Sequence, residues 1–142
     1  MIRLFLAISI FLAIAVNATR FDVRLELICN FQQQWQYSAY FYEHDLISPS
    51  EGMHTTPVYG SVQPSSSFAA QFDYSEGDGI GDNYYEPFLA LTHTCTDTGS
   101  QATATFYLGT VPVDSAGVVI QRRYLIDTRC DAFFCVLIDK QQ

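Results

Sequence analysis

The sequence predicts an all-β fold, namely a disulfide-bonded antiparallel β-sandwich of about seven strands. Three observations support this prediction. Apolar and polar residues alternate with period two in several segments, breaks rich in Gly, Pro and Ser separate these segments, and no segment beyond the amino terminus has a convincing helical period. There is no internal repeat. We therefore expect one domain over residues 19–142.

The amino terminus has the pattern of a secretory signal peptide over residues 1–18. Arg3 is followed by an uncharged, apolar run that ends at Val16. This run is shorter than the roughly 20 residues of a bilayer-spanning helix, so we expect no membrane span. Val16 and Ala18 supply the small residues read by signal peptidase, which places the cut before Thr19. The expected location is therefore secreted and extracellular, and an uncleaved anchor is the alternative.

The chain is acidic, with a formal net charge of −8. Removal of residues 1–18 takes away one of the seven basic residues and none of the fifteen acidic ones, which leaves −9. This sign argues against nucleic acid and anionic lipid as electrostatic partners. The alternative interpretation is that the acidity only keeps a secreted protein soluble.

Four cysteines, Cys29, Cys95, Cys130 and Cys135, are an even number in a chain expected to enter an oxidising compartment. Two disulfides are the default for such a set, and four cysteines allow three connectivities. We favour Cys29 with Cys95, which would tie distant strands, and Cys130 with Cys135, which needs only a tight local turn. A zinc site is the weaker alternative because the paired CxxC spacing is absent.

The first expected strand, 21–29, places its apolar residues on one face. The second, 37–44, is dense in aromatic side chains, which suit a half-buried pleated surface. A long connection follows over 45–64, with one short strand expected at 58–62. The apolar face of the first strand consists of Phe21, Val23, Leu25, Leu27 and Cys29.

The remaining expected strands also alternate. They are 68–74, 88–95, 102–108, 118–127 and 132–138. In the strand 68–74 one face holds Phe68, Ala70, Phe72 and Tyr74. In the strand 88–95 one face holds Leu89, Leu91, His93 and Cys95.

Motifs of catalysis are absent: there is no GxSxG, HExxH, P-loop or GxGxxG in a suitable context. The histidines His44, His54 and His93 fall in different elements, so we predict no catalytic residue and no cofactor. Cysteines in disulfides cannot act as nucleophiles. A secreted hydrolase that pairs His93 or His44 with a carboxylate is the alternative function.

Residues 76–82 form an acidic, glycine-rich loop, to which Asp73 and Glu86 could add carboxylates. Oxygen ligands on a flexible loop suit calcium. The spacing does not match the D-x-[DN]-x-[DN]-G loop, and acidic glycine loops are commonly solvated turns. We therefore assign no metal ligand.

Aromatic residues make up 15% of the chain, more than a domain of this size is expected to bury. Exposed Tyr and Trp are favoured contact residues at interfaces, so some of these side chains predict a binding surface. The alternative is that they are ordinary strand residues. The candidates for the surface are Trp35, Tyr40, Tyr42, Tyr84 and Tyr85, with Tyr37 as a further aromatic in the same region.

Leu-Ile-Cys-Asn at 27–30 leads into an aromatic strand that closes on Tyr-Glu-His-Asp at 42–45. This opening resembles that of the nematode transthyretin-like family of secreted proteins. Glu-Pro-Phe-Leu-Ala-Leu-Thr-His-Thr-Cys at 86–95 is similar to the family's P-Y-L-x-I-x-H-x-C strand. Ala-Thr-Phe at 104–106, Val-Pro at 111–112 and Tyr-Leu-Ile-Asp at 124–127 match its last two strands in order and spacing.

The chain departs from that family at two points. Leu25 and Glu26 stand where a glycine is expected, and the tail from Thr128 has no counterpart. The resemblance implies a transthyretin-like β-sandwich that is secreted, is not an enzyme and binds lipophilic or cell-surface ligands. The related hydroxyisourate hydrolases end in Y-R-G-S, whereas this chain ends in Asp-Lys-Gln-Gln, which disfavours that activity.

The function expected from these observations is an extracellular binding or bridging module whose partner is a hydrophobic small molecule, a lipid or a cell-surface protein. A hydrolase is one alternative, and a structural or inhibitory secreted protein is another. The sequence sets neither the ligand nor the oligomeric state.

Overall fold

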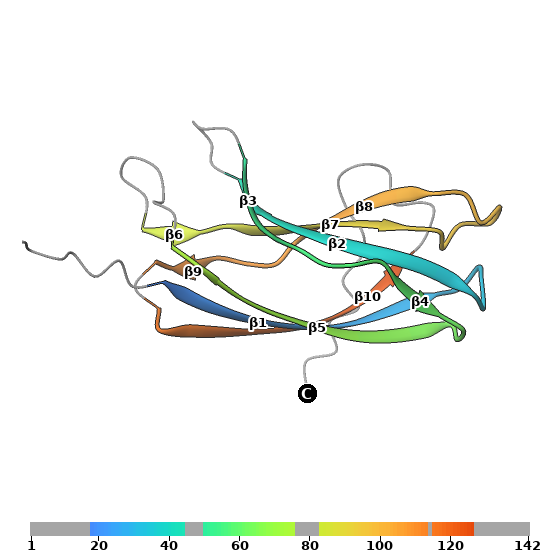
Figure 1. Cartoon of the computed structure of the whole chain (residues 1–142), viewed down its shortest axis with the longest axis horizontal. Coiled ribbons are helices and arrows are strands. Elements are labelled where there is room, and N and C mark those ends of the chain that lie inside the picture. Colours follow the sequence, from blue (N-terminus) through green and yellow to red (C-terminus); the bar gives the residue numbers. More distant parts are fainter. Residues whose placement is uncertain (1–17, 45–49, 76–82, 114, 127–142) are drawn as a thin grey trace, which may run out of the picture.

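The computed structural model describes residues 18–44, 50–75, 83–113 and 115–126. All regular structure in these residues is β, and two sheets lie one above the other with the core between them (Figure 1). The all-β prediction is confirmed. The strands are β1 (Thr19–Cys29), β2 (Trp35–Glu43), β3 (Glu51–Thr55), β4 (Tyr59–Ser61), β5 (Ser65–Tyr74), β6 (Tyr84–Tyr85), β7 (Pro87–His93), β8 (Ala102–Tyr107), β9 (Val111–Pro112) and β10 (Gly117–Ile126).

The larger sheet has five strands: β3, β2, β7 and β8 follow in that order, and β4 pairs with the start of β2 on the same edge as β3. The smaller sheet has the order β10-β1-β5, and β6 and β9 form a short two-stranded ribbon. All pairs in the larger sheet are antiparallel.

One pair corrects the prediction of a purely antiparallel fold, because β1 and β10 are parallel over ten residue pairs, from Arg20 with Gly117 to Cys29 with Ile126. Parallel neighbours cannot be joined by a hairpin and need a crossover connection. Here the crossover contains most of the described chain, including the whole five-stranded sheet. Alternation within each strand does not reveal this pairing, since it reads the same in either direction.

The inner faces of both sheets follow the predicted period of two. Residues at alternate positions of β1 are at most 2% exposed, from Phe21 to Cys29, and the same holds for β2 from Trp35 to Glu43. Rings from the two sheets meet in the core, as Phe41 of β2 lies 5.2 Å from Phe72 of β5 between ring centroids. The expected inward residues of the strands 68–74 and 88–95 are buried as predicted.

Some strand boundaries differ from the expectation. Glu51–Thr55 forms β3 although the sequence indicated a loop there, because Glu-Gly-Met-His-Thr has no period-two pattern and its strand exists through pairing with β2. The short strand expected at 58–62 is present as β4. The expected strand 132–138 lies outside the described residues. No helix in the described part of the chain is long and apolar enough to cross a membrane.

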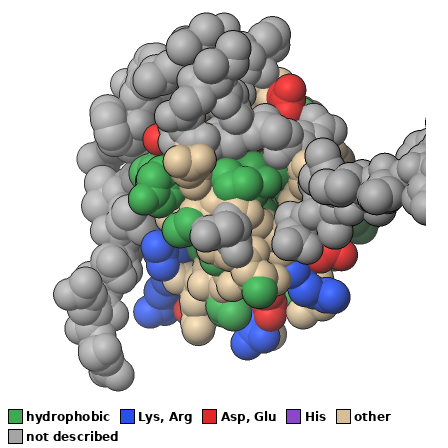
Figure 2. Space-filling view, turned by 90° about the vertical axis from the view of Figure 1, so that its left-hand side faces the viewer, with side chains coloured by type: hydrophobic (Ala, Val, Ile, Leu, Met, Phe, Trp, Pro, Cys, Tyr) green, Lys and Arg blue, Asp and Glu red, His purple; other side chains and the backbone are tan. Residues whose placement is uncertain are grey.

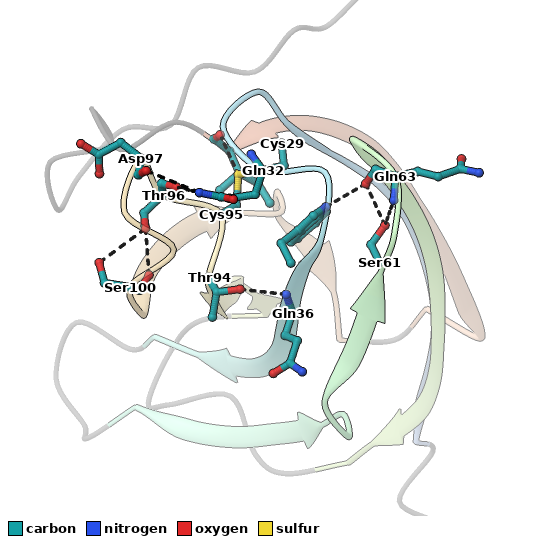
Figure 3. The surroundings of a disulfide bond; sticks show 12 residues. Cys29, Gln32, Gln36, Ser61, Gln63, Thr94, Cys95, Thr96, Asp97 and Ser100 are labelled. Carbon is teal, nitrogen blue, oxygen red and sulfur yellow. Dashed lines mark hydrogen bonds between the residues drawn. A yellow bond between two sulfur atoms is a disulfide. The ribbon is translucent and has the colours of Figure 1, made fainter.

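A disulfide between Cys29 and Cys95 links the two sheets at one end, as the sequence predicted (Figure 3). Cys29 ends β1, and Cys95 follows β7 by two residues. Two hydrogen bonds reinforce this end: the Trp35 indole N–H donates to the carbonyl of Gln63 at 3.0 Å, and the Cys29 amide donates to the carbonyl of Pro64 at 2.6 Å. Cys130 and Cys135 lie outside the described residues.

Candidate binding face on the five-stranded sheet

Three aromatic side chains form a row across the outer face of the five-stranded sheet. Tyr42 of β2 pairs with Phe88 of β7, and Phe88 pairs with Tyr107 of β8. All three lie at positions that alternate with buried residues, so their side chains point away from the core. Tyr40, two residues before Tyr42 and therefore on the same face, extends the row along β2. We call these four residues the aromatic row.

Neighbouring rings of the aromatic row are in contact. Tyr40 and Tyr42 have ring centroids 5.7 Å apart with planes at 17°, and Tyr42 and Phe88 are 5.6 Å apart at 19°. Phe88 and Tyr107 are 5.1 Å apart at 42°. Tyr40 and Tyr107 are 43% and 46% exposed. The row is therefore an offset stack of near-parallel rings that ends in a tilted one, open to solvent at both ends.

Small residues of adjacent strands make room for these rings. A Cβ at Gly52 of β3 would lie 2.6 Å from the Tyr40 hydroxyl oxygen, so glycine lets the phenol extend over β3. The Tyr42 side chain extends from β2 across β7, and its hydroxyl forms a hydrogen bond with the Thr105 side chain of β8. The β7 residue that pairs with Thr105 is the small Ala90. Burial raises the pKa of the Tyr42 phenol, and the bond to Thr105 offsets part of that rise.

A second row on the same face consists of hydroxyl groups. Ser38 of β2 pairs with Thr92 of β7, which pairs with Thr103 of β8. The Thr92 and Thr103 hydroxyl oxygens are 3.3 Å apart. Along β2, Ser38 lies two residues from Tyr40 and four from Tyr42. Along β7, Thr92 lies four residues from Phe88, which is about 13 Å at the rise of a strand.

Next to the hydroxyl row the surface is hollowed by about 180 Å³. Amide and hydroxyl groups contribute to the lining of this hollow. The Gln36 backbone N–H donates to the Thr94 hydroxyl at 2.9 Å, which fixes Thr94 beside β2 (Figure 3). The outer face thus changes from aromatic to neutral polar along the strands. The lining residues on this face are Gln36, Ser38, Thr92, Thr94, Gln101 and Val58.

Charge is distributed unequally between the two sheets. The strands β2, β7 and β8 contain no Lys, Arg or Asp, and their single carboxylate, Glu43, is 1% exposed on the inner face. All four arginines of the described residues, Arg20, Arg24, Arg122 and Arg123, lie on β1 or β10. Figure 2 shows the basic side chains in its lower half, on the side of the three-stranded sheet.

The predicted surface aromatics divide into two groups. Tyr40 and Tyr42 belong to the aromatic row, and Tyr84 is 49% exposed on β6, which pairs with β9 in the separate ribbon. Trp35 and Tyr85 correct the prediction, because they are 2% and 1% exposed and belong to the core.

The reason for this burial is the position of each residue in its strand. Trp35 shares the inner face of β2 with Tyr37, at a centroid distance of 4.9 Å. Tyr85 contacts Phe21 and Tyr74 through its ring.

Phe88 and Tyr107 were missed as surface residues. The signal was present in the alternation, since Leu89, Leu91 and His93 were assigned inward and Phe88 therefore had to point outward. Tyr107 directly follows the buried Phe106, so the same alternation places Tyr107 on the outer face.

The three histidines lie in different surroundings. His93 is 3% exposed, with no hydrogen-bond partner at Nδ1 among the described residues, and burial lowers its pKa below the ordinary 6.5. His54 stacks on Phe72 at a centroid distance of 5.0 Å. His44 is exposed, 5.8 Å from the Phe88 ring.

The described residues contain no group of three or more His, Cys, Asp or Glu side chains suited to holding a metal ion. Residues 76–82, the acidic loop considered for calcium, lie outside the described residues. Of its neighbours, Asp73 pairs with Arg20 in the strand register and Glu86 precedes β7.

Two carboxyl groups meet a phenol inside one end of the fold. Glu43 pairs with Glu51 across β2 and β3, and the Tyr74 hydroxyl donates to Glu51 at 3.1 Å. Burial is the main cause that raises the pKa of the Tyr74 phenol, and the neighbouring Glu43 and Glu51 raise it further. The neutral phenol of Tyr74 therefore donates a hydrogen bond to the Glu51 carboxylate, and this contact serves the fold.

No family model, no curated protein and no solved structure matches this chain.

Proposed function

We propose that this chain is a non-catalytic extracellular binding or bridging module for a lipophilic or cell-surface ligand, and that it binds through the outer face of β2, β7 and β8. The observation that carries the proposal is the exposed aromatic row. Apolar rings on a solvent-facing sheet cost free energy in a free monomer, and contiguous exposed patches of this kind mark interaction sites.

The expectation of secretion supports the extracellular part of the proposal. It rests on the signal peptide pattern at residues 1–18, and the disulfide between Cys29 and Cys95 is consistent with an oxidising compartment. The non-catalytic part rests on the resemblance to the transthyretin-like family and on the separate surroundings of His44, His54 and His93. A transthyretin-like form of the sandwich is likewise part of this proposal.

The test uses protein secreted by cells that express the full chain. Binding is measured to a fluorescent fatty acid, to phosphatidylcholine vesicles and to intact cells. The double substitution Tyr40→Ala with Tyr107→Ala removes the two exposed ends of the aromatic row and should abolish the binding that the wild type shows.

The matched control is Val119→Ala. Val119 is 65% exposed on β10, so the substitution removes exposed apolar surface from the opposite sheet and should leave binding unchanged. Binding that survives loss of the aromatic row, or an absence of binding to all three probes, would contradict the proposal.

A further inference from the structure

We propose that the ligand of this face is a neutral oligosaccharide, with one sugar ring stacked on the aromatic row and a neighbouring sugar unit bound by the hydroxyl row. This inference rests on the proposed function and narrows its cell-surface ligand to an uncharged glycan. Three features of the face support it: the exposed rings, the hydrogen-bonding groups next to the rings, and the lack of Lys, Arg and Asp in β2, β7 and β8.

The aromatic row matches the apolar side of a sugar ring. One side of many pyranose rings presents C–H groups whose hydrogens carry partial positive charge, and the face of an aromatic ring is negative. Stacked C–H groups on such a face gain dispersion and weak electrostatic attraction. Because Tyr40, Tyr42 and Phe88 stack on one another, the ring surface open to a sugar belongs to the half-exposed rings at the ends of the row, Tyr40 and Tyr107.

The hydroxyl row matches the rim of a sugar ring. Each Ser or Thr hydroxyl can donate one hydrogen bond and accept others, and a Gln amide can do both. Sugar hydroxyls have the same dual capacity. Ser38, Thr92 and Thr103 form the row, and the hollow beside it adds Gln36 and Gln101. Ligand sites of this type combine apolar surface with a few polar groups that set orientation.

The low charge of the face selects against other ligands. An anionic glycan or phosphate would call for Arg or Lys, and the described Arg residues are on β1 and β10. A cationic ligand would call for several accessible carboxylates. Glu43 of β2 is buried, and Glu86, which precedes β7, is the partly exposed carboxylate among the described residues beside the aromatic row. A fatty acyl chain would leave the hydroxyl row against hydrocarbon, which costs free energy.

The spacing favours an oligosaccharide over a monosaccharide. Phe88 and Thr92 on β7 are four residues apart, about 13 Å at the rise of a strand, which exceeds the size of one sugar ring. A chain of several sugar units that runs parallel to β2 and β7 can contact both rows. Phe88 lies at one end of β7 and Thr92 near the other, so β7 forms the floor of the site.

The experiment uses the secreted full-chain product and immobilised cello-, laminari-, chito- and manno-oligosaccharides as neutral probes, with heparin and phosphatidylcholine vesicles as comparators. We expect retention on at least one neutral oligosaccharide. Salt between about 0.1 and 0.5 M should leave this binding unchanged, because screening affects only ionic contacts.

Variants then test each row. Tyr42→Ala should weaken binding at least about tenfold. The double substitution Thr92→Val with Thr103→Val keeps the strand shape and the rings but removes two hydroxyls, and should weaken binding about three- to tenfold. Gln71→Ala, on the outer face of β5, is the control and should have no effect. If Tyr42→Ala fails to form the Cys29–Cys95 disulfide, Tyr107→Ala at the sheet edge replaces it and should also weaken binding.

The outcomes separate this inference from the proposed function. Retention on heparin or vesicles alone, or on no neutral oligosaccharide, overturns the glycan proposal. If cells bind the protein through the aromatic row and glycosidase treatment of those cells changes nothing, the glycan proposal fails while the binding module stands. If loss of the aromatic row leaves binding to cells and vesicles intact, both fail.

Discussion

The two sheets share one core and the same alternation, yet their outer faces have opposite chemistry. The outer face of the three-stranded sheet holds ion pairs: Arg24 lies 2.7 Å from Asp22, and Arg123 of β10 lies 3.2 Å from Glu26 of β1. On the five-stranded sheet, the outward positions of β2, β7 and β8 hold aromatic and hydroxyl side chains. Charged side chains are well solvated in water, whereas exposed stacked rings gain from a partner that covers them.

The difference also shows why alternation alone does not identify a binding surface. The period of two specifies which side chains point outward in both sheets. The chemistry of those outward residues, and their alignment across three strands, distinguishes a solvated face from a candidate site.

The largest expected effect comes from separating the two sheets. The double substitution Cys29→Ala with Cys95→Ala should lower the free energy of unfolding by about 4 kcal/mol, since the disulfide closes a 66-residue separation in the unfolded chain. Urea denaturation monitored by circular dichroism measures this loss. An unchanged midpoint would show that the hydrogen bonds at that end hold the sheets together without the disulfide.

A second effect concerns the inner face of the five-stranded sheet and depends on pH. The folded state lowers the pKa of His93, so the unfolded chain takes up its proton first as pH falls below 6.5. The contribution of neutral His93 to the free energy of unfolding is therefore fully present above pH 6.5. Below that pH it declines by at most about 1.4 kcal/mol per pH unit, until the pH reaches the lower pKa of the folded state.

Denaturation curves at several pH values test this dependence. His93→Leu should flatten it, and His44→Gln, at an exposed position, should leave it as in the wild type. Equal slopes in all three proteins would place the pH dependence elsewhere.

Two buried tyrosines, one from each sheet, should respond in opposite directions to loss of their hydroxyl. The Tyr37 hydroxyl is 2.9 Å from the Ser66 hydroxyl, so Tyr37→Phe removes a link between the sheets and should cost about 1 kcal/mol. The Tyr124 hydroxyl is buried and has no hydrogen-bond partner among the described residues, and burial raises its pKa to about 12.

Tyr124→Phe should therefore stabilise the protein by about 1 kcal/mol, because the unsatisfied hydroxyl disappears while the ring contact with Phe106 at 4.1 Å is kept. Thermal denaturation of the two variants side by side is the measurement. A loss of stability in Tyr124→Phe would indicate that the hydroxyl is satisfied in solution.

On the outer face of the three-stranded sheet the expected effect is smaller. Arg123→Gln breaks the ion pair between Arg123 and Glu26. Because both side chains are substantially exposed, the free energy of unfolding should fall by about 0.2–1 kcal/mol. The cost should shrink at high salt because exposed pairs are screened. A larger, salt-independent loss would mean that the Arg123 side chain contributes by packing.

The smallest effect on stability is expected on the aromatic face itself. Gly52→Ala places a Cβ 2.6 Å from the Tyr40 hydroxyl, which lies at the far end of a side chain able to move, so the free energy of unfolding should change by less than about 0.5 kcal/mol. The Tyr40 ring should nevertheless shift, and NMR ring resonances of Tyr40 and Tyr42 would report it. Unshifted resonances would show that Gly52 does not control the ring position.

Much of the fold followed from local pattern. The inward residues of β1, β5 and β7 were predicted correctly, because burial of one face imposes a period of two on the side chains. The Cys29–Cys95 pairing was also predicted, from chain separation and the expected compartment. β3 was missed since Glu51–Thr55 carries no pattern of its own and is a strand through its neighbour.

The candidate site was predicted only in part. Tyr40 and Tyr42 were selected for aromatic character, which equally selected the buried Trp35 and Tyr85. Composition cannot separate these pairs. Their position within the alternation can, as Trp35 shares a face with Tyr37 whereas Tyr40 and Tyr42 lie on the other side of the same strand.

The sequence by itself determined the all-β character and the inward and outward sets of β1, β5 and β7, and it favoured the cysteine pair that joins the sheets, because each depends on local periodicity or on residue chemistry. Tertiary structure alone decided the parallel pairing of β1 with β10, and the register that aligns Tyr42, Phe88 and Tyr107 in one row. The physical reason is that strand partners and register depend on contacts between segments far apart in the chain, which no local pattern encodes.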